Sequence, residues 1–237
     1  MTRFRLPTLI LSALLGVGSA HARTPVVVEL YTAQGCASCA KANGYAAALS
    51  ERPGVIALTF SVDYWDYLGW KDTLAKPEFT ERQKAYDARF GLRDVYTPQM
   101  IIDGGAQASG DKSDDVDALI RSARRAKPLN VEIAPRADGT VAVRRRGAAG
   151  PRGAYDVWLV RYVPRAPVVE VKEGENRGKT VAYANVVSQL TRLGGWSRRR
   201  AVFRPAAPTA DGEESLILVQ AANGGPIVAA ARWAPRN

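Results

Sequence analysis

The chain has 237 residues, of which 33 are basic and 23 acidic, so its formal charge at pH 7 is +10. It contains two cysteines and a single histidine, His21. Two cysteines are too few for an iron–sulfur or zinc site that is built from cysteines within one chain.

Residues 1–22 have the pattern of a cleaved secretory signal peptide. Two arginines give a basic start, residues 6–17 are mostly apolar but too short to span a bilayer, and Ala20-His21-Ala22 has the small-x-small pattern of a signal peptidase site. We therefore expect a periplasmic or secreted protein that is cleaved near Ala22; a membrane anchor, the alternative, needs a longer apolar stretch. Cleavage removes the only histidine, which excludes Ser–His and Cys–His catalytic pairs and the usual Cys/His zinc sites.

Both cysteines lie in the motif Cys36-Ala37-Ser38-Cys39, directly after the apolar run 26–32, which predicts a buried parallel strand. Two thiols at the start of a helix can close a small disulfide ring, and the unpaired N–H groups and the helix dipole favour a thiolate on the leading one. The motif predicts thiol–disulfide exchange, with Cys36 attacking and Cys39 resolving. No cofactor beyond this redox-active disulfide, and no metal, is expected. A structural disulfide and a soft-metal site are the alternatives. Both are less favoured, because a structural disulfide usually closes a longer loop and a soft-metal site often includes Met or His.

The chain up to residue 125 predicts strands and helices in the order β-α-β-α-β-β-α. The first two strands should be parallel, and Asp103-Gly104 signals a hairpin. The predicted elements are a strand at 26–32, a helix at 39–51, strands at 55–62, a helix at 79–90, a strand opened by Pro98, a strand at 106–109 and a helix at 111–125.

An aromatic segment, residues 63–72, follows the second predicted strand. Because the loops after parallel strands meet at one edge of a sheet, we expect this segment near the thiols. One interpretation is a wall that grips an apolar or peptide-like substrate; the alternative is an ordered loop whose aromatic rings pack under the next helix. The candidate substrate-binding residues are Tyr64, Trp65, Trp70 and Tyr96.

The segment from Tyr31 to Cys39 resembles the active-site strand and turn of glutaredoxins. Thr97-Pro98-Gln99, followed by apolar residues, resembles their cis-proline strand. Both features belong to the thioredoxin-like fold. The resemblance implies that the Thr97–Pro98 bond is cis and lies against the cysteine pair, where the backbone of Thr97 pairs with an extended substrate.

Residues 26–112 and 174–178 together resemble a family of exported bacterial proteins that have a thioredoxin-like domain of unknown function. The chain departs from the family pattern at Ser61, where relatives carry histidine. Without that histidine, Glu29 is the nearest candidate for a buried proton acceptor; a carboxylate at the sheet edge, paired with a cation, is the alternative. The shared markers are residues 29–32, 34–36, 63–72, 82–83 and 96–99.

The chain after residue 126 consists of short apolar runs separated by turn residues, such as Asp138-Gly139. We expect a signal peptide at 1–22, an α/β thioredoxin-like domain at 23–126 and a mostly β, sandwich-like domain at 127–237. The polar segment 173–179 is expected to turn the chain, and reaching back to the thiol site is the alternative.

Loss of the two signal-peptide arginines lowers the formal charge from +10 to +8, with arginine clusters at 144–146 and 198–200. Export argues against a nucleic-acid partner, and a solvated basic face is favoured over peripheral contact with a membrane. The expected partners are protein or small-molecule thiols, and the sequence contains no signal for an oligomeric state. The predicted function is exported thiol–disulfide exchange, with a non-catalytic binding or assembly module as the alternative.

Overall fold

The structure is a computed structural model that describes residues 24–126, 130–146, 153–165, 168–197, 200–206 and 211–234. The predicted signal peptide, with Ala22 at its cleavage site, lies outside the described residues. So do Arg198 and Arg199 of the second arginine cluster.

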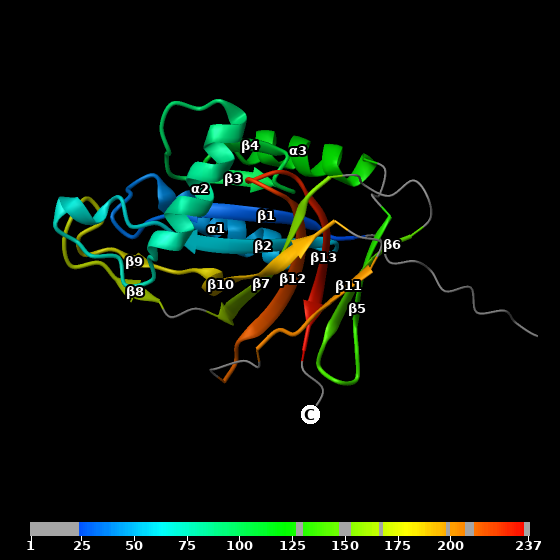
Figure 1. The fold of residues 1–237 in the computed structure, drawn as a ribbon. Helices are drawn as coiled ribbons and strands as arrows, with labels where there is room; N and C mark the ends of the chain where they lie inside the picture. The colour runs from blue at the N-terminus through cyan, green and yellow to red at the C-terminus, as the bar shows by residue number, and fades with distance from the viewer. Residues whose placement is uncertain are drawn as a thin grey trace, which may run out of the picture.

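The N-terminal part is α/β and follows the predicted order of elements, which is confirmed (Figure 1). All seven residues of the first strand are buried, which is why most of them are apolar. It pairs parallel to the second strand and antiparallel to the third. The elements are β1 (Val26–Thr32), α1 (Cys39–Ser50), β2 (Val55–Ser61), a 3-10 turn η1 (Asp66–Leu68), α2 (Pro77–Phe90), β3 (Gln99–Ile102), β4 (Ala106–Ser109) and α3 (Ser113–Arg125).

In the remaining described residues, strands are the only regular secondary structure. The predicted hairpin at Asp138-Gly139 joins the first two of these strands and is confirmed. The strands are β5 (Val131–Pro135), β6 (Val141–Arg145), β7 (Tyr155–Arg165), β8 (Val169–Glu170), β9 (Thr180–Val181), β10 (Ala184–Trp196), β11 (Arg200–Phe203), β12 (Glu214–Ala221) and β13 (Ile227–Trp233).

One eight-stranded sheet runs through both parts of the chain, in the order β13-β12-β7-β10-β2-β1-β3-β4 (Figure 1). The sequence predicted a sandwich-like domain at 127–237, and in the structure a strand of this part, β10, continues the N-terminal sheet beside β2. The junction is a pairing of Val186 with Thr59, supported by bonds from Thr59 Oγ1 to the Ala184 carbonyl (2.7 Å) and from Asn185 Nδ2 to the Ala57 carbonyl (2.8 Å). The added strand covers an edge of β2 that would otherwise expose unpaired backbone groups.

The sandwich-like character is present in the C-terminal part. A second sheet, β11-β6-β5, packs its buried face on the large sheet. Val141 and Val143 of β6 share one apolar cluster with Val157, Trp196 and Ile217. In Figure 1 this small sheet lies beside β13, whereas the short β8–β9 hairpin lies at the other end of the molecule, next to the segment around η1.

Helices cover both faces of the N-terminal strands. Val28 and Leu30 face α1 and α3, and the alternate residues Val27 and Tyr31 face α2. Strand residues alternate between the two faces, so Glu29 also lies on the α2 side. The C-terminal strands extend the core on this side, since Val160 and Leu216 belong to the same cluster as Val27.

Candidate functional site

The two cysteines lie between the end of β1 and the start of α1. Their sulfurs are bonded to each other, and their Cα atoms are 5.4 Å apart. Cys39 is the first residue of α1, and the backbone N–H of Cys39 donates to the Cys36 carbonyl at 3.2 Å. The hydroxyl oxygen of Ser38, at the N-cap, lies 3.5 Å from the Cys36 sulfur. The predicted disulfide pair at a helix N-terminus is therefore present.

Pro98 lies beside the same helix, and the Thr97–Pro98 bond is cis, as the resemblance implied. Gly110 allows this approach, because a Cβ at that position would lie 3.0 Å from the Cβ atoms of both Pro98 and Ala42 of α1. The backbone N–H of Gly110 also donates to the Pro98 carbonyl at 2.9 Å. A bulkier residue at Gly110 would push Pro98 away from α1.

Three of the four predicted substrate-binding aromatic residues come from the segment 63–72, and two of them, Trp65 and Trp70, bond to the proline strand and the cysteine turn. Tyr64 and Trp65 pack against the apolar cluster that contains both cysteines. The indole nitrogen of Trp65 donates to Thr97 Oγ1 at 2.8 Å, and that of Trp70 donates to Gln34 Oε1 at 2.8 Å. These aromatic side chains therefore tie residues 63–72 to both the cysteine turn and the proline strand.

The fourth aromatic residue, Tyr96, has different partners. Its hydroxyl donates to Gln107 of β4, and its carbonyl accepts a bond from Gln83 Nε2 at 2.8 Å. The amide of Gln83 also donates to Gln99 Oε1, and Gln99 Nε2 donates to Asp87 Oδ1, both at 2.8 Å. This buried network holds the chain on each side of the Thr97–Pro98 bond. Burial raises the pKa of Asp87 above its usual value, although the bond from Gln99 lowers it.

Both cysteines are closed off from solvent, each with 1 % of its surface exposed. The sequence did not predict this burial, because it depends on segments that are far from the cysteines along the chain. Two segments, residues 63–74 and 171–179, form a cover over the cysteine turn, and we refer to them together as the cover. In this structure a reacting thiol has no access to either sulfur.

Gln34 forms hydrogen bonds with both segments of the cover. Its backbone N–H donates to Asp72 Oδ2 at 2.7 Å, and its side-chain Nε2 donates to Thr73 Oγ1 at 3.0 Å. Its carbonyl accepts a bond from Asn176 Nδ2 at 2.8 Å. With the bond from Trp70 to its side-chain oxygen, the backbone and side chain of Gln34 are held by both segments of the cover.

The segment 173–179 turns the chain between the antiparallel strands β8 and β9, as expected. It also reaches back to the cysteine turn, which was the alternative. Asn176 is 2 % exposed, and its Nδ2 donates to the carbonyl oxygens of Gln34 and Cys36, both at 2.8 Å. Lys179 Nζ donates to the other side-chain atom, Asn176 Oδ1, at 3.1 Å. A turn and a long-range bond use the same polar residues, so the sequence does not distinguish them.

Asp72 is the buried anchor of the first segment. Besides Gln34, it accepts a bond from the backbone N–H of Leu74 at 2.9 Å, and its own N–H donates to Asp66 Oδ1 at 3.0 Å. Burial raises the pKa of Asp72, and the bonds from Gln34 and Leu74 oppose that effect. Asp72 lies in the predicted aromatic segment, but the sequence predicted no role for it.

Glu29, the candidate proton acceptor, is fully buried and paired with a cation, although it lies inside the core rather than at the sheet edge. Its Oε1 accepts a bond from Arg82 Nε at 2.9 Å, and its Oε2 accepts one from the hydroxyl of Tyr86. Burial acts to lower the pKa of Arg82, but the charge of Glu29 holds it above its usual value. Both carboxylate oxygens are thus engaged, and a role in proton transfer stays a prediction.

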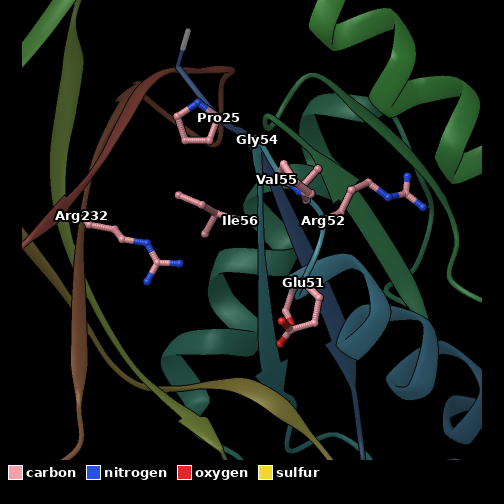
Figure 2. Close-up of a pocket in the computed structure, with 9 residues that line it drawn as sticks. Pro25, Glu51, Arg52, Gly54, Val55, Ile56 and Arg232 are labelled. Atoms are coloured by element: carbon pink, nitrogen blue, oxygen red, sulfur yellow. The ribbon is translucent and has the colours of Figure 1, made fainter. Parts of the chain in front are cut away.

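A surface hollow of about 370 Å³ lies at the opposite end of the strands, where β1 and β2 begin (Figure 2). Arg232 and Arg52 lie on opposite sides of it, with Pro25 and Ile56 between them. None of the predicted site residues lines this hollow. Arg52 is paired with Asp117 at 2.5 Å and Arg232 is paired with Glu214, so neither arginine of the hollow is left unpaired.

The described residues contain no cluster of three or more His, Cys, Asp or Glu side chains that could hold a metal ion. No helix within the described ranges is both long and apolar enough to cross a membrane.

A family model described as "Protein of unknown function (DUF1223)" matches residues 27–220. The chain belongs to this family. No curated protein matches the chain in sequence.

Two solved structures are similar to this one. The first is the crystal structure of a protein from Agrobacterium tumefaciens that was a structural genomics target: it is 28 % identical, with a TM-score of 0.71, and the match covers 92 % of this chain and 97 % of that chain. The second is HBP35 of Porphyromonas gingivalis, at 12 % identity and a TM-score of 0.59, with 90 % of this chain and 76 % of that chain covered. At this identity HBP35 is similar in fold alone.

Proposed function

We propose that the protein is an exported thiol–disulfide oxidoreductase of thioredoxin-like fold that acts through Cys36 and Cys39. The observation that carries this proposal is the disulfide at the N-terminus of α1 with the cis Thr97–Pro98 bond beside the same helix. A disulfide that closes so short a ring constrains the unfolded chain little, so stabilisation alone is a weak reason for it. Its place at a helix N-terminus favours the thiolate that exchange requires.

The exchange has two steps. A thiolate of a substrate dithiol attacks the Cys36 sulfur, the Cys36–Cys39 bond breaks, and Cys39 leaves as a thiolate. The second substrate thiolate then attacks the mixed disulfide, which releases an oxidised substrate and the reduced Cys36–Cys39 pair. Two electrons and two protons pass from the substrate to the cysteines. The reverse sequence reduces a substrate disulfide, and the reduction potential of the partner sets the direction.

Thr97, Trp65 and Tyr64 are proposed to form one wall of the substrate groove. Trp65 bonds to the side chain of Thr97 and not to its backbone. An extended substrate can therefore pair with the backbone of Thr97. Trp70 and Tyr96 support the groove indirectly, through Gln34 and through the network around Gln83.

A second candidate function is a non-catalytic binding or assembly module in which the disulfide is structural. The burial of both cysteines favours it, because a structural disulfide needs no access to solvent. The two candidates differ in one respect that can be measured: only the first requires turnover that depends on Cys36.

The test uses the chain without residues 1–22 in two assays, reduction of insulin and oxidative refolding of reduced ribonuclease A. We expect turnover that is lost in Cys36→Ala, while Ser38→Ala, a matched change within the same turn, keeps most of it. Unfolding curves must show that each variant is folded. Turnover that survives Cys36→Ala, or the absence of turnover in both assays, would refute the oxidoreductase and leave the structural disulfide.

A further inference from the structure

We propose that the β8–β9 loop, latched by Asn176, gates the disulfide so that exchange is selective for polypeptide thiols over small-molecule thiols. This inference rests on the proposed function and names its substrate class. Its starting point is that both cysteines are buried and that a segment of the C-terminal part of the chain bonds to the backbone of the cysteine turn.

Two hydrogen bonds from Asn176 hold the loop on the cysteine turn, and we call them the latch. The loop that carries Asn176 joins β8 and β9, which are two residues long each. Asn176 is its one deeply buried polar residue, whereas its neighbours Glu175 and Arg177 are exposed. The two bonds from Asn176 Nδ2 to the carbonyls of Gln34 and Cys36 therefore fasten the tip of the loop to the cysteine turn.

The base of the loop packs on the other segment of the cover. Val171, Val181 and Tyr183 form a small apolar cluster with Trp70 and Leu74, separate from the main core. Trp70 in turn donates to Gln34. The two segments thus close on one another and on one residue, and opening either of them exposes the same cysteine turn.

Small clusters with few buried contacts open at a lower free-energy cost than the core of a domain. A small thiol gains nothing from the opened cover except access to the sulfur. A polypeptide can instead make contacts with the outer surface of the cover that lower the cost of opening.

The outer surface of the cover offers such contacts. Tyr67 and Leu68 of η1 are 82 % and 41 % exposed, and they are two of the four large hydrophobic side chains that are exposed among the described residues. They lie between Trp65 and Trp70, which contact the proline strand and the cysteine turn. A polypeptide bound on this turn therefore sits on the segment whose displacement uncovers Cys36.

The first test measures how fast dithiothreitol reduces the disulfide, with the new thiols trapped by a maleimide. Dithiothreitol gives up two electrons and two protons, closes to its cyclic disulfide, and leaves Cys36 and Cys39 as thiols. We expect Asn176→Ala to raise this rate roughly tenfold, since it removes two buried hydrogen bonds of the closed form. Glu175→Ala, in the same loop but exposed, should leave the rate unchanged.

Trp70→Phe is the second variant, and it guards against a fold defect in Asn176→Ala. It keeps an aromatic ring in the small cluster but removes the bond to Gln34. We expect it to raise the dithiothreitol rate by a smaller factor. Rates equal to that of the wild type in both folded variants would overturn the gate.

The second test compares substrates. Tyr67→Ser should leave the dithiothreitol rate unchanged and slow the oxidation of reduced, unfolded ribonuclease A severalfold. An equal effect of Tyr67→Ser on both reactions would overturn the selectivity for polypeptides. If Asn176→Ala opens the site to dithiothreitol but no variant turns over any substrate, the gate stands and the proposed oxidoreductase function fails. If the wild type turns over ribonuclease A and Asn176→Ala changes no rate, the gate fails and the function stands.

Discussion

Asn176 and Cys36 are 140 positions apart in the sequence, yet the side-chain nitrogen of Asn176 lies 2.8 Å from the carbonyl oxygen of Cys36. A residue from the β-rich part of the chain therefore completes the surroundings of a motif in the α/β part. The two parts of the chain share the eight-stranded sheet, in which β10 lies beside β2, and the preceding β8–β9 hairpin packs on Trp70 and Leu74 near the cysteine turn.

We predict that residues 23–126 do not fold on their own. Removal of the rest of the chain would expose an edge of β2 and the apolar side chains that pack on Val160 and Leu216. A fragment that ends at Ala126 should show no cooperative unfolding transition in urea, followed by circular dichroism, and should aggregate. A cooperative transition with the same midpoint as the full chain would show that the α/β part is an independent domain.

We predict that the buried pair of Glu29 and Arg82 is strongly coupled. Their side chains are 0 % and 5 % exposed, so Glu29→Gln leaves a buried guanidinium without its counter-charge. The expected loss in the free energy of unfolding is about 3 kcal/mol, measured by urea denaturation. The double variant Glu29→Gln/Arg82→Met, in which no charge is left, should recover part of this loss. A loss below about 1 kcal/mol in the single variant would contradict the coupling.

The same Glu29→Gln variant tests the predicted proton transfer. If Glu29 accepts a proton during exchange, the variant changes the pH dependence of the step in which Cys39 resolves a mixed disulfide. A pH profile identical to that of the wild type would remove Glu29 from the mechanism and leave the ion pair as its whole role.

We predict that ionised Asp103 lowers the free energy of unfolding at neutral pH. Burial raises the pKa of Asp103 to about 6, although the bond from the Val27 N–H to its Oδ1 acts in the opposite direction. The folded-state pKa thus lies above the unfolded value of about 3.9. The stabilisation by protonated Asp103 is then complete below about pH 4 and is lost as the pH rises through about 6.

Asp103→Asn should therefore increase the free energy of unfolding at pH 7 by about 2 kcal/mol and have little effect at pH 4. Asparagine keeps an oxygen that can accept the bond from Val27, and it tolerates the positive φ of 47° at this position. Asp94→Asn, at an exposed position, is the control. A gain that is the same at pH 4 and pH 7 would show that ionisation of Asp103 is not its cause.

The sequence was sufficient for the local features of the site. The pattern of apolar residues and the turn residues predicted β1, α1 and the Asp103-Gly104 hairpin, because these elements depend on residues that are neighbours in the sequence. The parallel pairing of β1 and β2 places residues 63–72 near the cysteines, as expected. The cis geometry of Thr97–Pro98 came from the resemblance and not from any local pattern.

The features that the sequence did not predict all depend on long-range pairing. A strand such as β10 can pair with the edge of several other strands, and its sequence pattern does not show that its partner is β2. Asn176 lies in a glycine-flanked polar loop that has the composition of an ordinary turn. The burial of Cys36 follows from both of these pairings, so no local reading of the motif could predict it.

The most direct test of the account is to trap the mixed disulfide. The variant Cys39→Ala, with Cys36 activated by a chromogenic aromatic disulfide, is mixed with reduced, unfolded ribonuclease A, and the products are separated without reductant and identified by mass spectrometry. The account predicts a covalent complex joined through Cys36, which is absent in Cys36→Ala. A folded Cys39→Ala protein that is activated at Cys36 but forms no complex with the reduced polypeptide would contradict exchange at this site.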